Sequence, residues 1–138
     1  MIDHVSIGVR DLDRAMAFYD AVLGPLGYVR VVTHPGDVDH PFRSACYGPP
    51  GSDPNVTSHA APFWLEERPD PTDGGSGSHF CFAAPSRDAV ERVHAAGLAA
   101  GATDYGAPGL RAHYGPDYYA AFLVDPWGWR IEAVTFGP

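Results

Sequence analysis

Apolar and polar residues alternate over residues 2–9, and a helical pattern follows them. The alternation predicts a strand with one apolar face toward the core and one small, polar face. After Asp11, which can cap a helix, apolar residues recur at the spacing of one helix face, and a Gly-Pro pair at residues 24 and 25 ends the pattern. The first part of the chain therefore predicts a strand followed by a helix.

The same order of features returns 75 positions later. His79 corresponds to His4, and Ser86, a second capping residue, corresponds to Asp11. In each copy the histidine opens an alternating run, the capping residue follows seven positions later, and a helical pattern then begins. This repeat predicts two tandem copies of one supersecondary unit, with the two histidines in equivalent places.

Each copy continues with three further strands. In the first copy they are predicted at residues 28–33, 43–47 and 62–67. In the second copy a strand at 79–83 and a helix from Ser86 to near Gly101, carrying Val90, Val93 and Leu98, precede strands at 102–106, 118–124 and 130–136. Gly/Pro-rich loops are predicted at 48–61 and 106–117. We therefore predict an α+β fold of two βαβββ modules, about residues 1–70 and 75–138, within a single domain spanning 1–138.

Composition narrows the classes of function. The 45 % apolar fraction suffices for a buried core, and the net charge of −8 arises from 17 acidic and 9 basic residues, all of the latter arginine. The lack of lysine excludes Schiff-base and P-loop chemistry, and an acidic chain without a basic run argues against nucleic-acid and membrane partners. No apolar stretch approaches a membrane span of ~20 residues, so we expect a soluble, cytoplasmic protein.

Three residues form a candidate metal site. His4 and His79 lie on the polar faces of the first strands of their modules, and these faces enclose a pocket if the two sheets face each other. Glu132 lies between Ile131 and Ala133 in an apolar strand, so alternation directs its carboxylate away from both neighbours, and its burial requires compensation. Two imidazoles and one carboxylate suit a divalent first-row metal with positions left open for a substrate.

Three stretches also carry a family resemblance: HVSIGVRDLDRAMAFYDAVLGPLGY, GSHFCFAAPSRDAVERVHAAG and AAFLVDPWGWRIEAV. They combine a histidine on the first strand, an FY pair in the first helix and a terminal DP-x-G-x-x-IE hairpin. This pattern resembles the vicinal oxygen chelate superfamily, the group of glyoxalases, bleomycin-resistance proteins and type I extradiol dioxygenases. The resemblance implies paired βαβββ modules that form a curved mixed-sheet cup around a divalent metal. It maps His4, His79 and Glu132 onto metal-ligand positions.

The sequence departs from glyoxalase I-like members at a fourth position. In those members a glutamate on the last strand of the first module completes the site, but the matching strand here reads PFWLEER. Matching residues 63–65 to residues 131–133 places Trp64 there, whereas a shift by two residues would place Glu66 there on the same face. We favour Trp64, which argues against a glyoxalase I but is compatible with three-ligand members such as fosfomycin-resistance-type transferases and extradiol dioxygenases.

Several further residues are assigned smaller roles. We expect Trp64, Tyr47 and Tyr119 to bind the substrate, within a set of aromatic residues that also includes Tyr114, Tyr118 and Trp127. His113 and Tyr114, in the second loop, are the candidates for catalytic proton transfer. Cys81, next to His79 on the same face, is expected to be a small buried thiol.

These observations leave two classes of function open. The first is a metal-dependent enzyme, a lyase, isomerase or dioxygenase-like protein, that acts on a small oxygen-bearing organic substrate with Zn, Fe, Mn, Ni or Co. The second is a metal-free protein of the bleomycin-resistance kind that sequesters a drug or metabolite. Short superfamily members pair, which implies a homodimer whose two sites each take His4 from one chain and His79 with Glu132 from the other. The open sheet edge and polar face of each module favour the same pairing.

Overall fold

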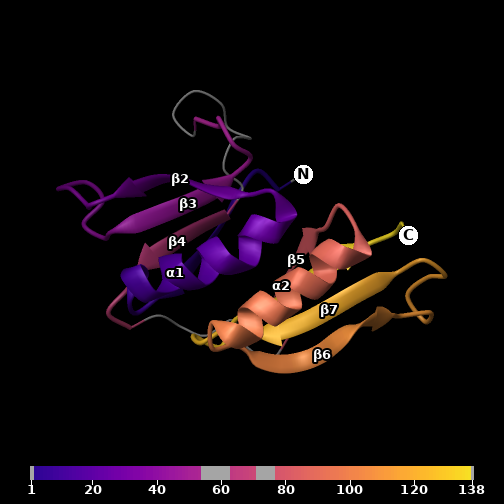
Figure 1. Ribbon diagram of the computed structural model, residues 1–138. Coiled ribbons are helices and arrows are strands. Elements are labelled where there is room, and N and C mark those ends of the chain that lie inside the picture. Colours follow the sequence, from indigo (N-terminus) through magenta and orange to yellow (C-terminus); the bar gives the residue numbers. More distant parts are fainter. Residues whose placement is uncertain (1, 54–62, 71–76, 138) are drawn as a thin grey trace. The chain divides into compact units, whose positions relative to one another are not determined.

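The computed structural model describes residues 2–53, 63–70 and 77–137 of the chain. Its elements follow one another in the predicted order (Figure 1). They are β1 (Val5–Val9), α1 (Leu12–Leu23), the 3₁₀ turn η1 (Gly24–Leu26), β2 (Val29–His34), β3 (Ser44–Gly48), β4 (Phe63–Glu67), β5 (His79–Ala83), α2 (Arg87–Ala99), β6 (Thr103–Leu110), β7 (Tyr119–Val124) and β8 (Arg130–Thr135).

The strands form two four-stranded mixed sheets, with the orders β1-β4-β3-β2 and β5-β8-β7-β6. In each sheet the first strand of the module pairs in parallel with the last, and the remaining pairs are antiparallel. The predicted α+β fold of two βαβββ modules is therefore confirmed. Contacts divide the chain into two compact units, residues 1–20 with 27–72 and residues 21–26 with 73–138.

Helix α1 buries its apolar face, and its residues up to Asp20 belong to the first unit while its end, from Ala21, belongs to the second. The residues at its predicted core positions, from Leu12 to Leu23, are buried, as is Leu26 just beyond the helix. Tyr19 packs its ring 5.1 Å from that of Phe63 in β4, and the buried Tyr47 hydroxyl donates to the Met16 carbonyl at 3.2 Å. The helix therefore covers the sheet face to which Phe63 and Tyr47 belong.

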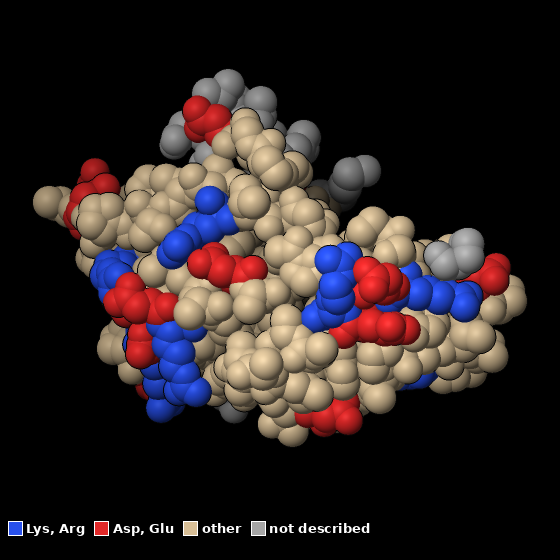
Figure 2. Space-filling view, in the orientation of Figure 1, with Lys and Arg blue, Asp and Glu red and all other residues tan. Residues whose placement is uncertain are grey.

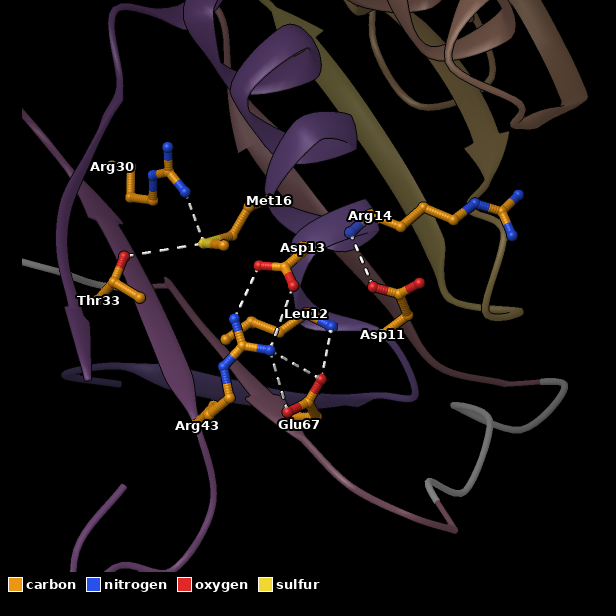
Figure 3. A network of polar contacts seen from close by, with 9 residues as sticks. All are labelled: Asp11, Leu12, Asp13, Arg14, Met16, Arg30, Thr33, Arg43 and Glu67. Atoms are coloured by element: carbon orange, nitrogen blue, oxygen red, sulfur yellow. Dashed lines mark hydrogen bonds and ion pairs between the residues drawn. The ribbon is translucent and has the colours of Figure 1, made fainter. Parts of the chain in front are cut away.

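The N-terminus of α1 is held by Asp11 just before the helix, by Glu67 of β4 and by Arg43, the residue before β3 (Figure 3). Asp11 Oδ1 accepts a hydrogen bond from the Arg14 amide, as its predicted capping role requires. Glu67 Oε1 accepts the Leu12 amide at 3.1 Å. Arg43 donates to Asp13 at 2.7 Å and lies 3.5 Å from both Glu67 oxygens, so one guanidinium joins the first turn of the helix to β4.

In the second unit α2 packs on β6, β7 and β8, and Ser86 caps it as predicted by accepting the Ala89 amide. Val90 and Val93 are buried, whereas Leu98, the third apolar residue of the predicted helix, is 41 % exposed. Gly97 occupies the inward position instead, where the side chain of Leu123 lies so close that a Cβ atom would not fit.

Strand β6 extends to Leu110, beyond the predicted end at residue 106. Gly106, Pro108 and Gly109 were expected to form a loop, yet they continue the pairing with β7 through two register shifts. β6 lies at the edge of its sheet and pairs only with β7, so Pro108, which lacks an amide hydrogen, does not cost a hydrogen bond to a second neighbouring strand. The other predicted loop, residues 48–61, lies outside the described residues from position 54 onward.

Acidic and arginine side chains are intermixed on the face of the molecule in Figure 2. Ion pairs among the described residues include Arg43–Asp13 and Arg92–Asp88, at 2.7 and 2.8 Å. None of the helices among the described residues has the length and apolar character needed to span a membrane.

Candidate functional site

The second unit brings two of the three predicted metal ligands into contact. The parallel register of β5 and β8 pairs Cys81 with Glu132 and Phe80 with Ile131. The side chains of His79, Cys81 and Glu132 therefore share one face of the sheet, as the alternation predicted, while Phe80 and Ile131 share the other. His79 Nε2 lies 3.1 Å from Glu132 Oε2.

Glu132 is a buried carboxylate with polar partners on both oxygens. The residue is 3 % exposed, and its Oε1 accepts a hydrogen bond of 2.6 Å from the Tyr118 hydroxyl. Its Oε2 faces His79, whose imidazole is half exposed. The burial of this carboxylate is thus compensated by a phenol on one side and an imidazole on the other.

Tyr118 is a partner of Glu132 that the sequence did not reveal. Burial, followed by the hydrogen bond to Glu132, raises the pKa of the Tyr118 hydroxyl above its ordinary value, so the hydroxyl keeps the proton that it donates. Strand parity could have indicated this contact, because residue 118 directly precedes β7 and has the same parity as Phe122, which pairs with Glu132.

Cys81 adjoins the same pair of side chains. Its predicted burial is wrong, because the residue is exposed. The atoms around its sulfur nevertheless exclude enough water to raise the pKa of the thiol to about 12, and the Glu132 carboxylate contributes to this increase. Near neutral pH Cys81 therefore stays a protonated thiol, which is a poor nucleophile.

The two residues proposed for proton transfer lie next to Tyr118. His113 and Tyr114 are exposed in the turn between β6 and β7, with their ring centroids 4.1 Å apart. The ring of Tyr114 lies 5.2 Å from that of Tyr118. A continuous row of side chains thus leads from the exposed turn through Tyr118 to Glu132.

The first unit carries the equivalent sheet face, with Trp64 in place of the glutamate. The registers pair Trp64 with Ser6, two residues after His4, just as Glu132 pairs with Cys81, two residues after His79. This equivalence agrees with the alignment that places Trp64 at the fourth position. Glu66 lies on the same face but forms an ion pair with Arg68.

A cavity of about 510 Å³ opens on this face of the first unit. His4 lines it together with Trp64, His34 and Phe42. The rings of His34 and Trp64 are nearly parallel, at 14° with centroids 6.3 Å apart, and form a flat aromatic wall. His4 itself is exposed and bonds to Asp3 through Nδ1 at 2.9 Å.

Two of the three residues expected to bind the substrate lie on the other faces of their sheets. Tyr47 is fully buried beneath α1, where it also donates to Asp20 at 3.0 Å. Tyr119 donates to Glu91 of α2 at 2.9 Å, on the face opposite Glu132. Trp64 is the member of the predicted set that lines the cavity.

The donors of the second unit suit a divalent metal but do not complete a site alone. An imidazole nitrogen and a carboxylate oxygen converge within 3.1 Å, which is the N/O pair that such metals accept. Within the described residues, however, there is no group of three or more His, Cys, Asp or Glu side chains that could hold a metal ion. A third donor, predicted to be His4, is needed to complete the set.

Comparisons with known proteins agree with this architecture. No curated protein matches the chain. Among solved structures, a glyoxalase/bleomycin resistance protein from Albidiferax ferrireducens T118 is 33 % identical, with a TM-score of 0.72 over 95 % of this chain and 94 % of that one. A mutant of glyoxalase I from Zea mays is 22 % identical, with a TM-score of 0.68 over 96 % of this chain and 43 % of that one.

A mutant of the fosfomycin resistance protein FosX from Listeria monocytogenes, in complex with Mn(II) and 1S,2S-dihydroxypropylphosphonic acid, shares the fold at 14 % identity. Its TM-score is 0.67 over 100 % of this chain and 93 % of that one. The sequence-family model of the Glyoxalase/Bleomycin resistance protein/Dioxygenase superfamily matches residues 1–133 of the chain. Because that match covers nearly the entire chain, the protein belongs to the glyoxalase/bleomycin resistance protein/dioxygenase superfamily.

Proposed function

We propose that this protein is a metal-dependent enzyme that acts on a small organic substrate bearing oxygen atoms. The observation that carries the proposal is the contact of 3.1 Å between His79 Nε2 and the buried Glu132 Oε2. A buried carboxylate oxygen and an imidazole nitrogen that converge on one face of a strand pair are the kinds of atom that divalent metals accept. His4, the equivalent of His79 in the first module, is proposed as the third ligand.

A divalent metal held by these three residues would supply Lewis-acid stabilisation of negative charge on a substrate oxygen. Of the residues around it, Tyr118 fixes the Glu132 carboxylate through its hydrogen bond of 2.6 Å. The ring of Tyr114 contacts that of Tyr118, and the ring of His113 contacts that of Tyr114. Both exposed side chains are proposed to exchange protons between substrate and solvent.

The cavity of the first unit is the proposed binding region for the organic part of the substrate. The flat wall formed by His34 and Trp64 suits a planar or apolar group. Among the described residues that line the cavity, Arg68 is the only arginine and is paired with Glu66, while Asp37 and Asp39 add negative charge. A strongly anionic group would therefore find little unpaired positive charge there.

The same cavity supports a second candidate, a metal-free protein that binds a drug or metabolite. Its volume of about 510 Å³ is enough for a small organic molecule, and its aromatic wall needs no metal to bind one. The two candidates differ in whether the His79–Glu132 pair holds a metal when the protein works.

Metal analysis of the untagged protein distinguishes the candidates. We expect one divalent metal per site in wild-type protein purified without a metal-affinity tag or reloaded after chelation, and loss of that metal in the His79→Ala variant. Wild-type protein that binds no metal under any loading condition would instead support the metal-free binder. Screening the loaded protein against α-ketoaldehydes, catechols, epoxides and acyl-CoA thioesters would then identify the reaction.

We also propose that the protein works as a homodimer with two equivalent sites. Each site would take His4 from one chain and His79 with Glu132 from the other. The physical reason is that His4 lies on the open polar face of one four-stranded sheet and the His79–Glu132 pair on that of the other, and a symmetric partner can cover both faces.

A further inference from the structure

The two oxygen atoms of Glu132 have different partners. Oε1 accepts the hydrogen bond from Tyr118 at 2.6 Å, and Oε2 lies 3.1 Å from His79 Nε2. The carboxylate is 3 % exposed, so water has little access with which to replace either partner. One oxygen is thus engaged by a hydroxyl, and the other lies beside the nitrogen atom of the second proposed ligand.

We infer that Tyr118 is a positioning residue that retains Oε1 of Glu132 and leaves Oε2 as the single oxygen that Glu132 offers to a metal. This inference rests on the proposed function, because it assigns Tyr118 a role in that same site. It adds a residue that lies in neither the predicted ligand set nor the pair proposed for proton transfer.

The surroundings of Tyr118 keep its hydroxyl in place. Its ring meets that of Phe136 edge to face, with centroids 5.2 Å apart at 87°. The ring of Tyr114 lies 5.2 Å away at 55°. A phenol packed against two rings loses little further freedom when it donates, so it can fix the carboxylate before any ligand arrives.

The consequence concerns the number of positions left for a substrate. A free carboxylate can bind a metal through one or both of its oxygens. A short hydrogen bond from a phenol makes Oε1 a weaker ligand, so Glu132 would occupy one position and leave another for a substrate oxygen. Partners of this kind change metal affinity by about 10- to 100-fold when they are removed.

The test compares Tyr118→Phe with Tyr119→Phe. Both changes delete one hydroxyl from neighbouring positions, but Tyr119 donates to Glu91 on the opposite face of the sheet. Co(II) is titrated into each untagged protein, its affinity is measured by competition with a chromophoric chelator, and its visible absorption is recorded. We expect about 10- to 100-fold weaker binding and an altered Co(II) spectrum for Tyr118→Phe alone.

Wild-type affinity and a wild-type Co(II) spectrum in Tyr118→Phe would overturn the inference. A purely structural role would lower thermal stability but leave the spectrum unchanged. If Tyr118→Phe does not fold, infrared difference spectra of wild-type protein with and without metal decide the question. A wide separation of the two carboxylate stretches supports binding through one oxygen, and a narrow separation overturns it.

The His79→Ala variant separates this inference from the proposed function. If His79→Ala loses Co(II) while Tyr118→Phe behaves as wild type, the metal site stands and the role of Tyr118 is wrong. If His79→Ala binds Co(II) as tightly as wild type, both the site and the role of Tyr118 are wrong.

Discussion

Gly97 faces the buried side chain of Leu123 with no Cβ atom between them. A Cβ atom at this position would lie 2.3 Å from Leu123 Cδ1, and Leu123 is only 2 % exposed, so its side chain has little space into which to move. We expect Gly97→Ala to lower the free energy of unfolding by about 1–3 kcal/mol through overpacking, partly offset by the gain of about 1 kcal/mol in helix propensity. Urea unfolding measures the net change.

Gly24→Ala is the matched control, since a Cβ atom there meets nothing within 4 Å and its φ angle is not positive. A Gly97→Ala protein as stable as Gly24→Ala would show that the core around Leu123 can repack.

Neighbouring residues show how far the sequence could define the site. Strand alternation correctly oriented His79 and Glu132, because each lies in a strand whose parity is unambiguous. It did not separate Tyr118 from Tyr119, which are adjacent and therefore project to opposite faces of the sheet. Their functions depend on which of them shares a face with Glu132, and that is decided by the pairing of β7 with β8.

The ion pair between Asp13 of α1 and Arg43, the residue before β3, gives a prediction about pH. The hydrogen bond from Arg43, followed by its charge, lowers the pKa of the Asp13 carboxyl below its ordinary value of 3.8. The unfolded chain therefore binds the proton more tightly, so this contribution to stability is present above about pH 4 and is lost as the pH falls through the lowered pKa. We expect Asp13→Asn to be less stable than wild type at pH 7 and to lose less stability between pH 7 and pH 3.

Urea unfolding at the two pH values checks this prediction, with Asp117→Asn as the control that removes the same charge from an exposed loop. An equal loss of stability on acidification in wild type and Asp13→Asn would mean that the ion pair in Figure 3 does not contribute in solution.

The elements themselves were largely predictable, because alternation and helical spacing are local properties of the sequence. The exceptions needed information from other strands. β6 continues through Gly106, Pro108 and Gly109, which are typical of a loop, because an edge strand tolerates a missing amide and irregular register. Leu98 matched the repeat but is exposed, because Gly97 allows α2 to approach Leu123 at the neighbouring position.

The tandem repeat was visible in the sequence. The repeat does not say whether the proposed site takes its residues from both halves of one chain or from two chains of a dimer. Mixing His4→Ala chains with Glu132→Ala chains tests the proposed exchange between subunits. If sites are shared, each mixed dimer has one intact site and one doubly altered site, so about half of the sites in isolated mixed dimers should bind metal. If each chain builds its own site, both sites carry one lesion, and no binding should return although mixing is confirmed.

The most direct measurement is the metal affinity of Glu132→Gln beside that of Glu66→Gln. Glutamine keeps the size of the buried side chain and can still accept from Tyr118, whereas Glu66 lies on the first sheet and pairs with Arg68. We expect one metal per site in wild type, unchanged affinity in Glu66→Gln, and a loss of about 100-fold or more in Glu132→Gln, since removal of an outer partner alone costs about 10- to 100-fold. Equal affinity in wild type and Glu132→Gln would contradict the proposed metal centre.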